Sequence, residues 1–299
     1  MKILITGAGG FVGSRMVECF TGQGHEVVGV DRGVPSLTVD SGLYSHIQAD
    51  TTKKGEWQKA VAASDVVVNL AGKNIFGRWS KETKQAIFDS RIRTTENVVE
   101  ALSGENGSIL LSTSAVGYYG DRGDDLLDEN EGNGDDFLAS VCLKWEEEAN
   151  KALMKGVRVA NMRFALVMGR TGGALQMMLP AFKGFVGGPL GTGRQYMPWI
   201  HIDDLIAAHD FVIGCHEVSG PVNCCAPNPV RNETFARTLG KVLGRPAVFR
   251  VPKFALSLAM GELGEMILAS QRAVPEKLTA HGFSFKYPEL EQALTDLLR

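Results

Sequence analysis

Short apolar runs alternate with longer amphipathic segments along the first 170 residues of this 299-residue chain. The runs are rich in Val, Ile and Leu, and near-continuous ones such as Val66–Leu70 fit strands that are buried on both faces. We predict strands at 2–6, 26–31, 46–50, 66–70, 108–114 and 158–167, and helices at 11–23, 57–63, 81–103 and 137–155. This alternation is typical of βαβ units and a parallel sheet.

The pattern changes near residue 170. Residues 169–193 are rich in glycine and contain one short helical segment, and further helices are predicted near 233–243, 253–267 and 288–298. We therefore predict a doubly wound α/β domain over 1–170, followed by a smaller, mostly helical substrate domain over 171–299. Segments near 194–215 are expected to return to the first domain.

Composition narrows the classes of function. With 31 basic and 34 acidic residues the net charge is −3, and no helix carries a clustered basic face, so we expect no nucleic-acid partner. No apolar run approaches the length of a membrane span, and the chain enters a strand at once without a signal-peptide pattern. We expect a cytoplasmic location. The five cysteines show no metal-ligand spacing, so we expect free thiols and no metal.

The sharpest motif is a glycine loop between the first strand and the first helix. It contains Gly7, Gly10 and Gly13, with Phe11 and Val12 opening the helix. Gly7 allows a tight turn, Gly10 admits a pyrophosphate, and Gly13 lets the helix pack against the sheet. Because the first N–H groups of a helix favour anions, the loop predicts dinucleotide binding in a Rossmann-type domain.

Two charged residues end the second predicted strand. The carboxylate of Asp31 suits the ribose hydroxyls of NAD and repels the 2′-phosphate of NADP. Arg32 follows it and suits either adenine stacking or a 2′-phosphate. Asp31 favours NAD slightly, and both cofactors stay open.

Two further strand ends point to the same crevice, because ligands bind at the carboxyl ends of parallel strands. Asp50 is placed to bond the adenine amino group, or alternatively to cap a helix. The fourth strand ends with Leu70, Ala71 and Gly72, where small residues let the backbone pass the adenosine ribose.

With these motifs, the chain resembles the extended short-chain dehydrogenases/reductases, and more narrowly their atypical "epimerase family protein" group, which is similar to nucleoside-diphosphate-sugar epimerases. The resemblance covers essentially the whole chain. It rests on residues 6–13, 69–75, 78–79, 90–95, 163, 167–169, 172–174, 187–193, 198–205 and 272–278.

The resemblance implies an NADP-dependent site built partly from Asp31, Arg32, Leu70, Ala71 and Arg91. It also implies that Phe164 and Leu166 pass the nicotinamide. Members of the group usually lack an acid at the position of Asp31.

The wider superfamily uses Ser, Tyr and Lys, the last two four residues apart on one helix. Ser114 and Lys144 match the Ser and the Lys, and Lys144 is then expected to hold the nicotinamide ribose. Ser140 stands in the place of the Tyr. An aliphatic hydroxyl ionises at a much higher pH than a phenol, so Ser140 is not expected to transfer the proton.

Other residues are candidates for that proton. Tyr118, next to Tyr119, follows Ser114 in the chain, with a substrate-loop aromatic as the alternative interpretation. His201 is the other titratable candidate, or else a structural histidine.

The glycine-rich stretch 177–199 is expected to fold over a substrate. Its candidate substrate residues are Arg194, Tyr196 and Trp199, joined by Asn74 from the loop after the fourth strand. With Lys73 and Arg78 nearby, they indicate a polar and even anionic small molecule. The resemblance also implies a homodimer in which the helices at 81–103 and 137–155 form the interface.

Two functions stay open. The first is an NAD(P)-dependent oxidoreductase or epimerase-like enzyme acting on a sugar-like or carbonyl substrate. The second is a non-catalytic dinucleotide-binding redox sensor or scaffold, which the missing Tyr favours.

Overall fold

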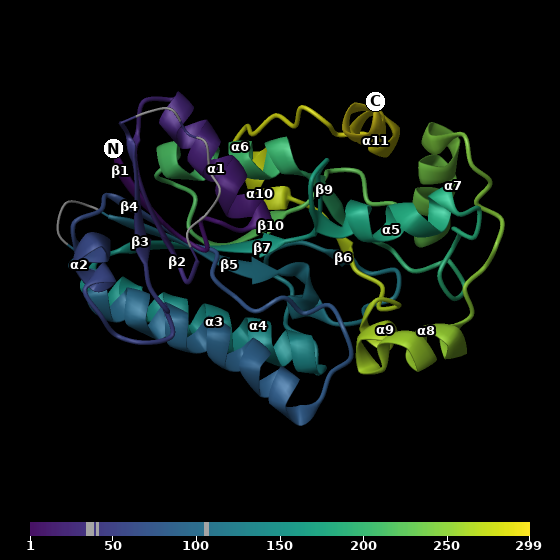
Figure 1. Cartoon of the computed structure of the whole chain (residues 1–299), viewed down its shortest axis with the longest axis horizontal. Coiled ribbons are helices and arrows are strands. Elements are labelled where there is room, and N and C mark those ends of the chain that lie inside the picture. Colours follow the sequence, from purple (N-terminus) through teal and green to yellow (C-terminus); the bar gives the residue numbers. More distant parts are fainter. Residues whose placement is uncertain (34–38, 40–41, 105–107) are drawn as a thin grey trace.

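A seven-stranded parallel sheet forms the centre of the computed structural model, which describes residues 1–33, 39, 42–104 and 108–299 (Figure 1). The strand order is β10–β7–β5–β4–β1–β2–β3. The bounds are β1 (Lys2–Thr6), β2 (Glu26–Asp31), β3 (Tyr44–Gln48), β4 (Val66–Asn69), β5 (Ile109–Ala115), β7 (Arg158–Phe164) and β10 (Gly220–Cys224). The direction of winding reverses between β1 and β4, which confirms the predicted doubly wound α/β fold.

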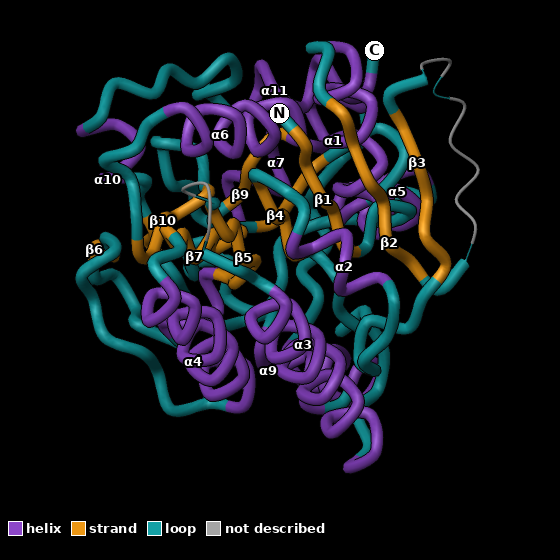
Figure 2. Tube along the Cα trace, turned by 90° about the vertical axis from the view of Figure 1, so that its left-hand side faces the viewer, coloured by secondary structure: helices purple, strands orange, loops and turns teal. Residues whose placement is uncertain are grey.

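Helices cover both faces of the sheet (Figure 2). On one face lie α2 (Trp57–Ala62), α3 (Lys81–Ala101) and α4 (Phe137–Asn150), and on the other lie α1 (Phe11–Gly22) and α6 (Ile202–Gly214). Alternate strand residues feed the two cores: Ile3 and Ile5 face α1, and Leu4 faces α2 and α3. Burial on both faces explains why the strands are continuously apolar.

The second part of the chain is divided between the sheet and a smaller helical lobe. β10 and α6 belong to the first domain's layers, so the return extends past residue 215. A separate core joins α5 (Gly173–Lys183), α7 (Asn232–Leu243) and α11 (Leu290–Leu298). The remaining elements are a short helix η2 (Val116–Tyr119), β6 (Leu126–Leu127), α8 (Lys253–Met260), α9 (Glu262–Met266), β11 (Arg272–Ala273) and α10 (Glu276–Ala280).

Three predicted elements are broken in the structure. The strand predicted at 158–167 ends at Phe164, and β8 (Leu166–Met168) then pairs with β9 (Trp199–His201) in a separate sheet. The helix predicted at 253–267 is interrupted by Gly261, whose φ of +63° is a conformation that favours glycine. The helix predicted at 137–155 ends at Asn150 and continues as a 3₁₀ turn, η3 (Lys151–Lys155).

A buried polar network fixes the end of β4 against β1, α3 and α4. Asn69 accepts a 2.7 Å hydrogen bond from the Thr6 hydroxyl and donates a 2.8 Å bond to Thr95 Oγ1. Trp145 Nε1 donates to the same Thr95 oxygen at 2.8 Å. Asn69, Thr6 and Thr95 are fully buried. The network therefore fixes the position at which the chain leaves the sheet, at Leu70.

We expect Asn69→Ala to lower the free energy of unfolding by about 2–3 kcal/mol, because it leaves the buried Thr6 hydroxyl without its acceptor. Chemical denaturation followed by circular dichroism measures the change. The exposed Asn133, changed to Ala, is the matched control and is expected to have little effect. Equal stability of the two variants would contradict the role of the network.

Among the described residues, no helix is both long and apolar enough to cross a membrane.

Candidate functional site

The glycine loop adopts the close geometry that its sequence predicts. Gly7 has φ +73°, and a Cβ there would lie 3.2 Å from the Ala71 backbone. A Cβ on Gly13 would lie 2.2 Å from Gly7 O, so the loop and α1 touch at this residue. Gly10 begins α1 and brings no side-chain acceptor to it. The first N–H groups of α1 are therefore open to an anionic ligand.

A second glycine group accommodates the ring of Phe11. A Cβ on Gly169, Gly172 or Gly173 would lie 2.4, 2.5 or 2.9 Å from that ring. The residues between β8 and α5 therefore hold the first residue of α1 in place. The sequence predicts a loop for this glycine run, and the spacing of its glycines is the signal that could have indicated the contact with Phe11.

Asp31 lies directly beside the glycine loop. Its carboxylate accepts hydrogen bonds of 2.9 Å from both Gly9 N and Arg32 N, while the Arg32 side chain is exposed. The carboxylate thus stands at the end of β2, where a cofactor's adenosine ribose is expected, with lone pairs to spare.

Asp50 lies in a turn rather than at a helix cap. Its Oδ1 accepts bonds from the Thr52 hydroxyl at 2.7 Å and from Thr52 N at 3.1 Å. The hydroxyl bond is the main cause that lowers the pKa of Asp50. Its contact with adenine stays a prediction.

Arg91 reaches the end of β4 from α3. It donates to Lys73 O at 3.0 Å and to Ile87 O at 3.1 Å, and its guanidinium lies 5.2 Å from the centre of the Trp145 ring. A Cβ on Gly72 would be 3.3 Å from the guanidinium carbon. Arg91 is therefore a fixed cation beside the Leu70–Gly72 turn.

Ser114 is tied into a buried ion pair. Its Oγ donates a 2.7 Å bond to Glu146 Oε1, and Arg163 donates bonds of 2.8 and 2.9 Å to the two oxygens of the same carboxylate. Burial lowers the pKa of Arg163, but the bonds with Glu146 outweigh it and the net direction is upward. A hydroxyl has one proton, so Ser114 can offer a ligand only its lone pairs while this bond lasts.

The face of α4 that meets Ser114 differs from the one that the sequence predicts. Besides Glu146, Cys142 contacts Ser114, and Leu138 lies against η2. These three residues are four positions apart and share one helical face. Burial, followed by the Glu146 charge, raises the pKa of the Cys142 thiol to about 11. It is thus a neutral group.

Ser140 and Lys144 lie on the outer side of the same helix. Lys144 Nζ is 2.6 Å from Glu147 Oε2 and its side chain is 56% exposed, while the exposed Ser140 donates to Phe137 O. The prediction that Lys144 works beside Ser114 is wrong, because the buried stripe of α4 turns it away. The positions facing Ser114 hold neither a phenol nor an ammonium.

The other candidates for proton transfer differ in their burial and in their contacts. Tyr119 is fully buried, bonds Asn223 and Arg163, and has a pKa raised mainly by burial. Tyr118 is half-buried, with its ring 3.6 Å from the Arg163 guanidinium carbon. His201 is buried against Tyr287 and accepts the Asp203 N–H, which makes it structural.

Phe164 and Leu166 flank the end of β7, where both are partly exposed. Their contact with a nicotinamide stays a prediction.

The substrate-side prediction is wrong for Trp199. Its side chain is 1% exposed and belongs to the core of the helical lobe. Asn74 and Arg194 are exposed, Asn74 bonding Phe76 N within its own turn. Tyr196 is stacked between Arg231 and Arg272, whose guanidinium carbons lie 4.5 and 5.2 Å from the centre of its ring.

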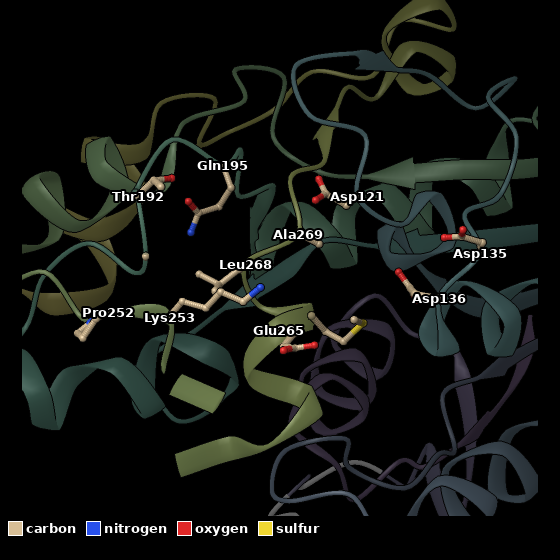
Figure 3. A pocket seen from close by; sticks show the side chains of 12 residues that line it. Asp121, Asp135, Asp136, Thr192, Gln195, Pro252, Lys253, Glu265, Leu268 and Ala269 are labelled. Atoms are coloured by element: carbon tan, nitrogen blue, oxygen red, sulfur yellow. The ribbon is translucent and has the colours of Figure 1, made fainter. Parts of the chain in front are cut away.

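A cavity of about 640 Å³ lies instead between the loops around α4 and the α8–α9 segment (Figure 3). Its lining comprises Asp121, Asp135, Asp136, Gly191, Thr192, Gln195, Pro252, Lys253, Glu265, Met266, Leu268 and Ala269. Asp121 follows η2, and Asp135 and Asp136 lead into α4. The loops after η2 and before α4, and not β5 or α4 themselves, thus line this pocket. The sequence does not predict that the acids of this pocket lie together, because they belong to separate loops.

Comparison with known proteins decides the family. The model of the "NAD dependent epimerase/dehydratase family" matches residues 3–225. This chain belongs to that family. Residues 251–297 match a second model, a "domain of unknown function (DUF1731)".

Relatives span the whole chain. The chloroplastic "Epimerase family protein SDR39U1 homolog" of Arabidopsis thaliana is 39% identical, covering 100% of this chain and 87% of that protein. "Epimerase family protein YfhF" of Bacillus subtilis (strain 168) is 36% identical and covers 100% and 98%. The structure of human epimerase family protein SDR39U1 (isoform2) with NADPH has a TM-score of 0.86 at 30% identity, covering 99% of each chain. These family members confirm the resemblance stated above.

Gly10→Val is expected to abolish NAD(P) binding by this family member while leaving it folded. A Cβ on Gly10 meets only Gly7 O, at 3.2 Å, and the larger side chain occupies the space before the open N–H groups of α1. Calorimetry measures binding and thermal unfolding measures stability. Glu56→Gln, an exposed change away from the loop, is the control. Undiminished affinity in Gly10→Val would contradict the assignment.

Asp31→Asn is expected to move the cofactor preference toward NADP by about tenfold or more. The change keeps the side chain's shape and its acceptor oxygen but removes a charge that repels a 2′-phosphate. Titration of wild type and variant with NADH and NADPH gives the ratio of affinities. An unchanged ratio of the NADH and NADPH affinities would show that Asp31 does not contact the adenosine ribose.

Proposed function

We propose that this protein binds NAD(P) and transfers a hydride between it and a small polar carbonyl compound or alcohol. The observation that carries the proposal is the glycine loop with the open N-terminus of α1, close to the fixed cation Arg91 and at the edge of the sheet that also carries Ser114. NADPH in the human relative supports NADP, and Asp31 supports NAD. Bound cofactor supplies a hydride from its nicotinamide.

Each group of residues in the proposed site contacts a different part of the cofactor. Phe11, Val12 and Gly13 offer N–H groups to the pyrophosphate, and Gly10, whose own N–H donates to Gly7 O at 3.0 Å, leaves room for it. Asp31, Arg32, Asp50, Leu70, Ala71 and Gly72 surround the adenosine half. Arg91, fixed beside the Leu70–Gly72 turn, contacts a phosphate or the adenosine ribose. Phe164 and Leu166 bound the nicotinamide end.

We assign the substrate proton to Tyr118. Ser114 has its only proton bonded to Glu146, so it accepts a hydrogen bond from the reacting group instead of donating one. Tyr118 is the partly exposed phenol that follows Ser114 in η2. The other phenol of η2, Tyr119, is buried and its hydroxyl donates to Asn223.

The test begins with NADPH binding, followed by a screen of small ketones and aldehydes for NADPH oxidation. We expect Tyr118→Phe to lower turnover by about 100-fold or more while leaving cofactor affinity intact. Ser140→Ala and Lys144→Met are the controls and are expected to stay near wild type. A large loss in Ser140→Ala, with Tyr118→Phe active, would overturn the assignment.

A non-catalytic NAD(P)-binding sensor or scaffold is the second candidate. Cys142 beside Ser114 and Leu138 against η2 favour it, since neither transfers a proton near neutral pH. It predicts NADPH binding without oxidation by any carbonyl compound in the screen.

We also propose a cytoplasmic location and a homodimer through α3 and α4. The outer side of α4 carries the ion pairs Lys144–Glu147 and Lys151–Glu148. In a dimer through this face, the ion pairs of one copy would lie against those of the other. Sedimentation gives the state of assembly.

A further inference from the structure

An exposed apolar surface lies on the helical lobe, at the right-hand end of the molecule in Figure 1. Three segments contribute to it, namely the residues that follow α5, the residues that follow α7, and α8 itself. We call this surface the lobe patch. Its large apolar side chains, each at least half exposed, are Phe185, Val186, Val248, Phe249, Phe254 and Leu258.

The two loop segments of the lobe patch run side by side. Val251 N donates to Pro189 O at 2.9 Å, and Gly191 N donates to Val251 O at 2.8 Å. A Cβ on Gly188 would lie 2.0 Å from Phe249 O, so the two backbones touch at this point. These contacts hold the apolar side chains of both segments at one end of the lobe.

Helix α8 continues the lobe patch directly after the second loop. Phe254 and Leu258 are four positions apart and therefore share one helical face. Leu256, which lies on the opposite side of the helix, is its buried residue. The face that carries Phe254 and Leu258 is thus left in solvent.

The backbone of Phe185 gives a second indication of an outside contact. Its φ is +64°, and among the described residues it is the one non-glycine residue with a positive φ. Phe185 N donates to Phe182 O at 3.0 Å and Val186 N to Ala181 O at 2.9 Å, which is the motif that usually ends a helix with glycine. A large side chain that takes this unfavourable conformation and stays half exposed points to a partner outside the chain.

Basic residues surround the lobe patch, and acids are missing from its segments. Residues 171–202 and 234–261 contain seven Lys and Arg residues and no Asp or Glu, whereas the rest of the chain has 24 basic and 34 acidic residues, a net charge of −10. Three of the seven pair with acids of α7 and α11, and Lys253 lines the acidic cavity.

Two cations next to Phe185 are left without an acid. Lys183 lies two residues before it, and the Arg245 guanidinium carbon lies 4.5 Å from the centre of its ring. Neither Lys183 nor Arg245 forms an ion pair within the described part of the chain. The lobe patch therefore combines exposed apolar groups with uncompensated positive charge.

We propose that the lobe patch binds the surface of a membrane that contains anionic lipids, so that the protein lies on the membrane without crossing it. The Phe, Val and Leu side chains enter the boundary between headgroups and acyl chains, and Lys183 and Arg245 contact headgroup phosphates. The acidic remainder of the chain is repelled by the same surface, which orients the lobe toward the lipid. This binding goes beyond the proposed function and needs no reaction.

A second copy of the chain fits the lobe patch less well. Two such patches face to face would bring Lys183 and Arg245 of one copy toward the same cations of the other, and like charges repel. Apolar side chains that project from three separate segments suit a fluid lipid surface, which needs no matching groove.

Sedimentation of the full chain with lipid vesicles tests the proposal. One set of vesicles contains phosphatidylcholine alone, and the other contains equal amounts of phosphatidylcholine and phosphatidylglycerol. We expect binding to the anionic vesicles to be about tenfold tighter or more, because each basic residue near such a surface adds to the attraction. Added salt is expected to weaken it.

Phe185→Gly separates the fold from the binding. Since glycine favours a positive φ, the temperature of unfolding is expected not to fall, whereas affinity for anionic vesicles is expected to fall about tenfold. Phe254→Ser with Leu258→Ser is expected to have an equal or larger effect. The matched control is Leu153→Ser with Met154→Ser, which removes an exposed apolar pair that lies between two lysines in η3 and is expected to bind as wild type.

Three results would overturn the proposal. The first is no sedimentation with anionic vesicles at low salt, and the second is an equal loss of binding in the η3 control. The third is self-association of the free protein that Phe185→Gly abolishes, without any binding to vesicles, because it would assign the lobe patch to a second copy. None of these measurements uses NADPH oxidation, so a failure of the proposed hydride transfer leaves them unaffected.

Discussion

The buried ion pair between Glu146 and Arg163 is the interaction on which the arrangement of the site depends. It joins α4 to β7, and its side chains are 8% and 3% exposed. Such a pair is expensive to desolvate and expensive to break, since removing one partner leaves a buried charge. Here each group is further satisfied, Glu146 by Ser114 and Arg163 by Tyr119. The rotation of α4 about its axis is therefore fixed, and with it the residues that face the end of β5.

The same network continues into the C-terminal part of the chain. Tyr119 bonds Asn223 of β10, and Asn223 N donates to Glu129, which also receives the Lys277 N–H. Burial raises the pKa of Glu129 despite these bonds. One chain of polar contacts thus links the serine position in the dinucleotide-binding half to α10 in the segment of unknown function. This linkage joins the regions that the two family models match, residues 3–225 and 251–297.

Much of the first domain could be predicted from sequence, because its signals are local. Gly7, Gly10 and Gly13 are constrained by one loop, and the continuous apolar strands need only the rule that parallel sheets are buried. The orientation of α4 was misjudged because a spacing of four says that Ser140 and Lys144 share a face, and not which face. The apolar stripe of Leu138, Cys142, Trp145 and Ala149 was the better guide, since it marks the side that meets the sheet. The pocket carboxylates gave no such signal, since they converge only after the loops around residues 121, 135 and 265 have folded together.

The edge strand β10 has a consequence for how the chain is made. β7 ends at residue 164, but the partner that covers its outer edge spans Gly220–Cys224. During synthesis from the N-terminus, the first six strands are complete while that edge still presents unpaired backbone groups. Some sixty residues must leave the ribosome before the edge is closed. The nascent protein therefore passes through a stage that is open to pairing with other chains, and the segment that runs through β8, α5, β9 and α6 sets how long this stage lasts.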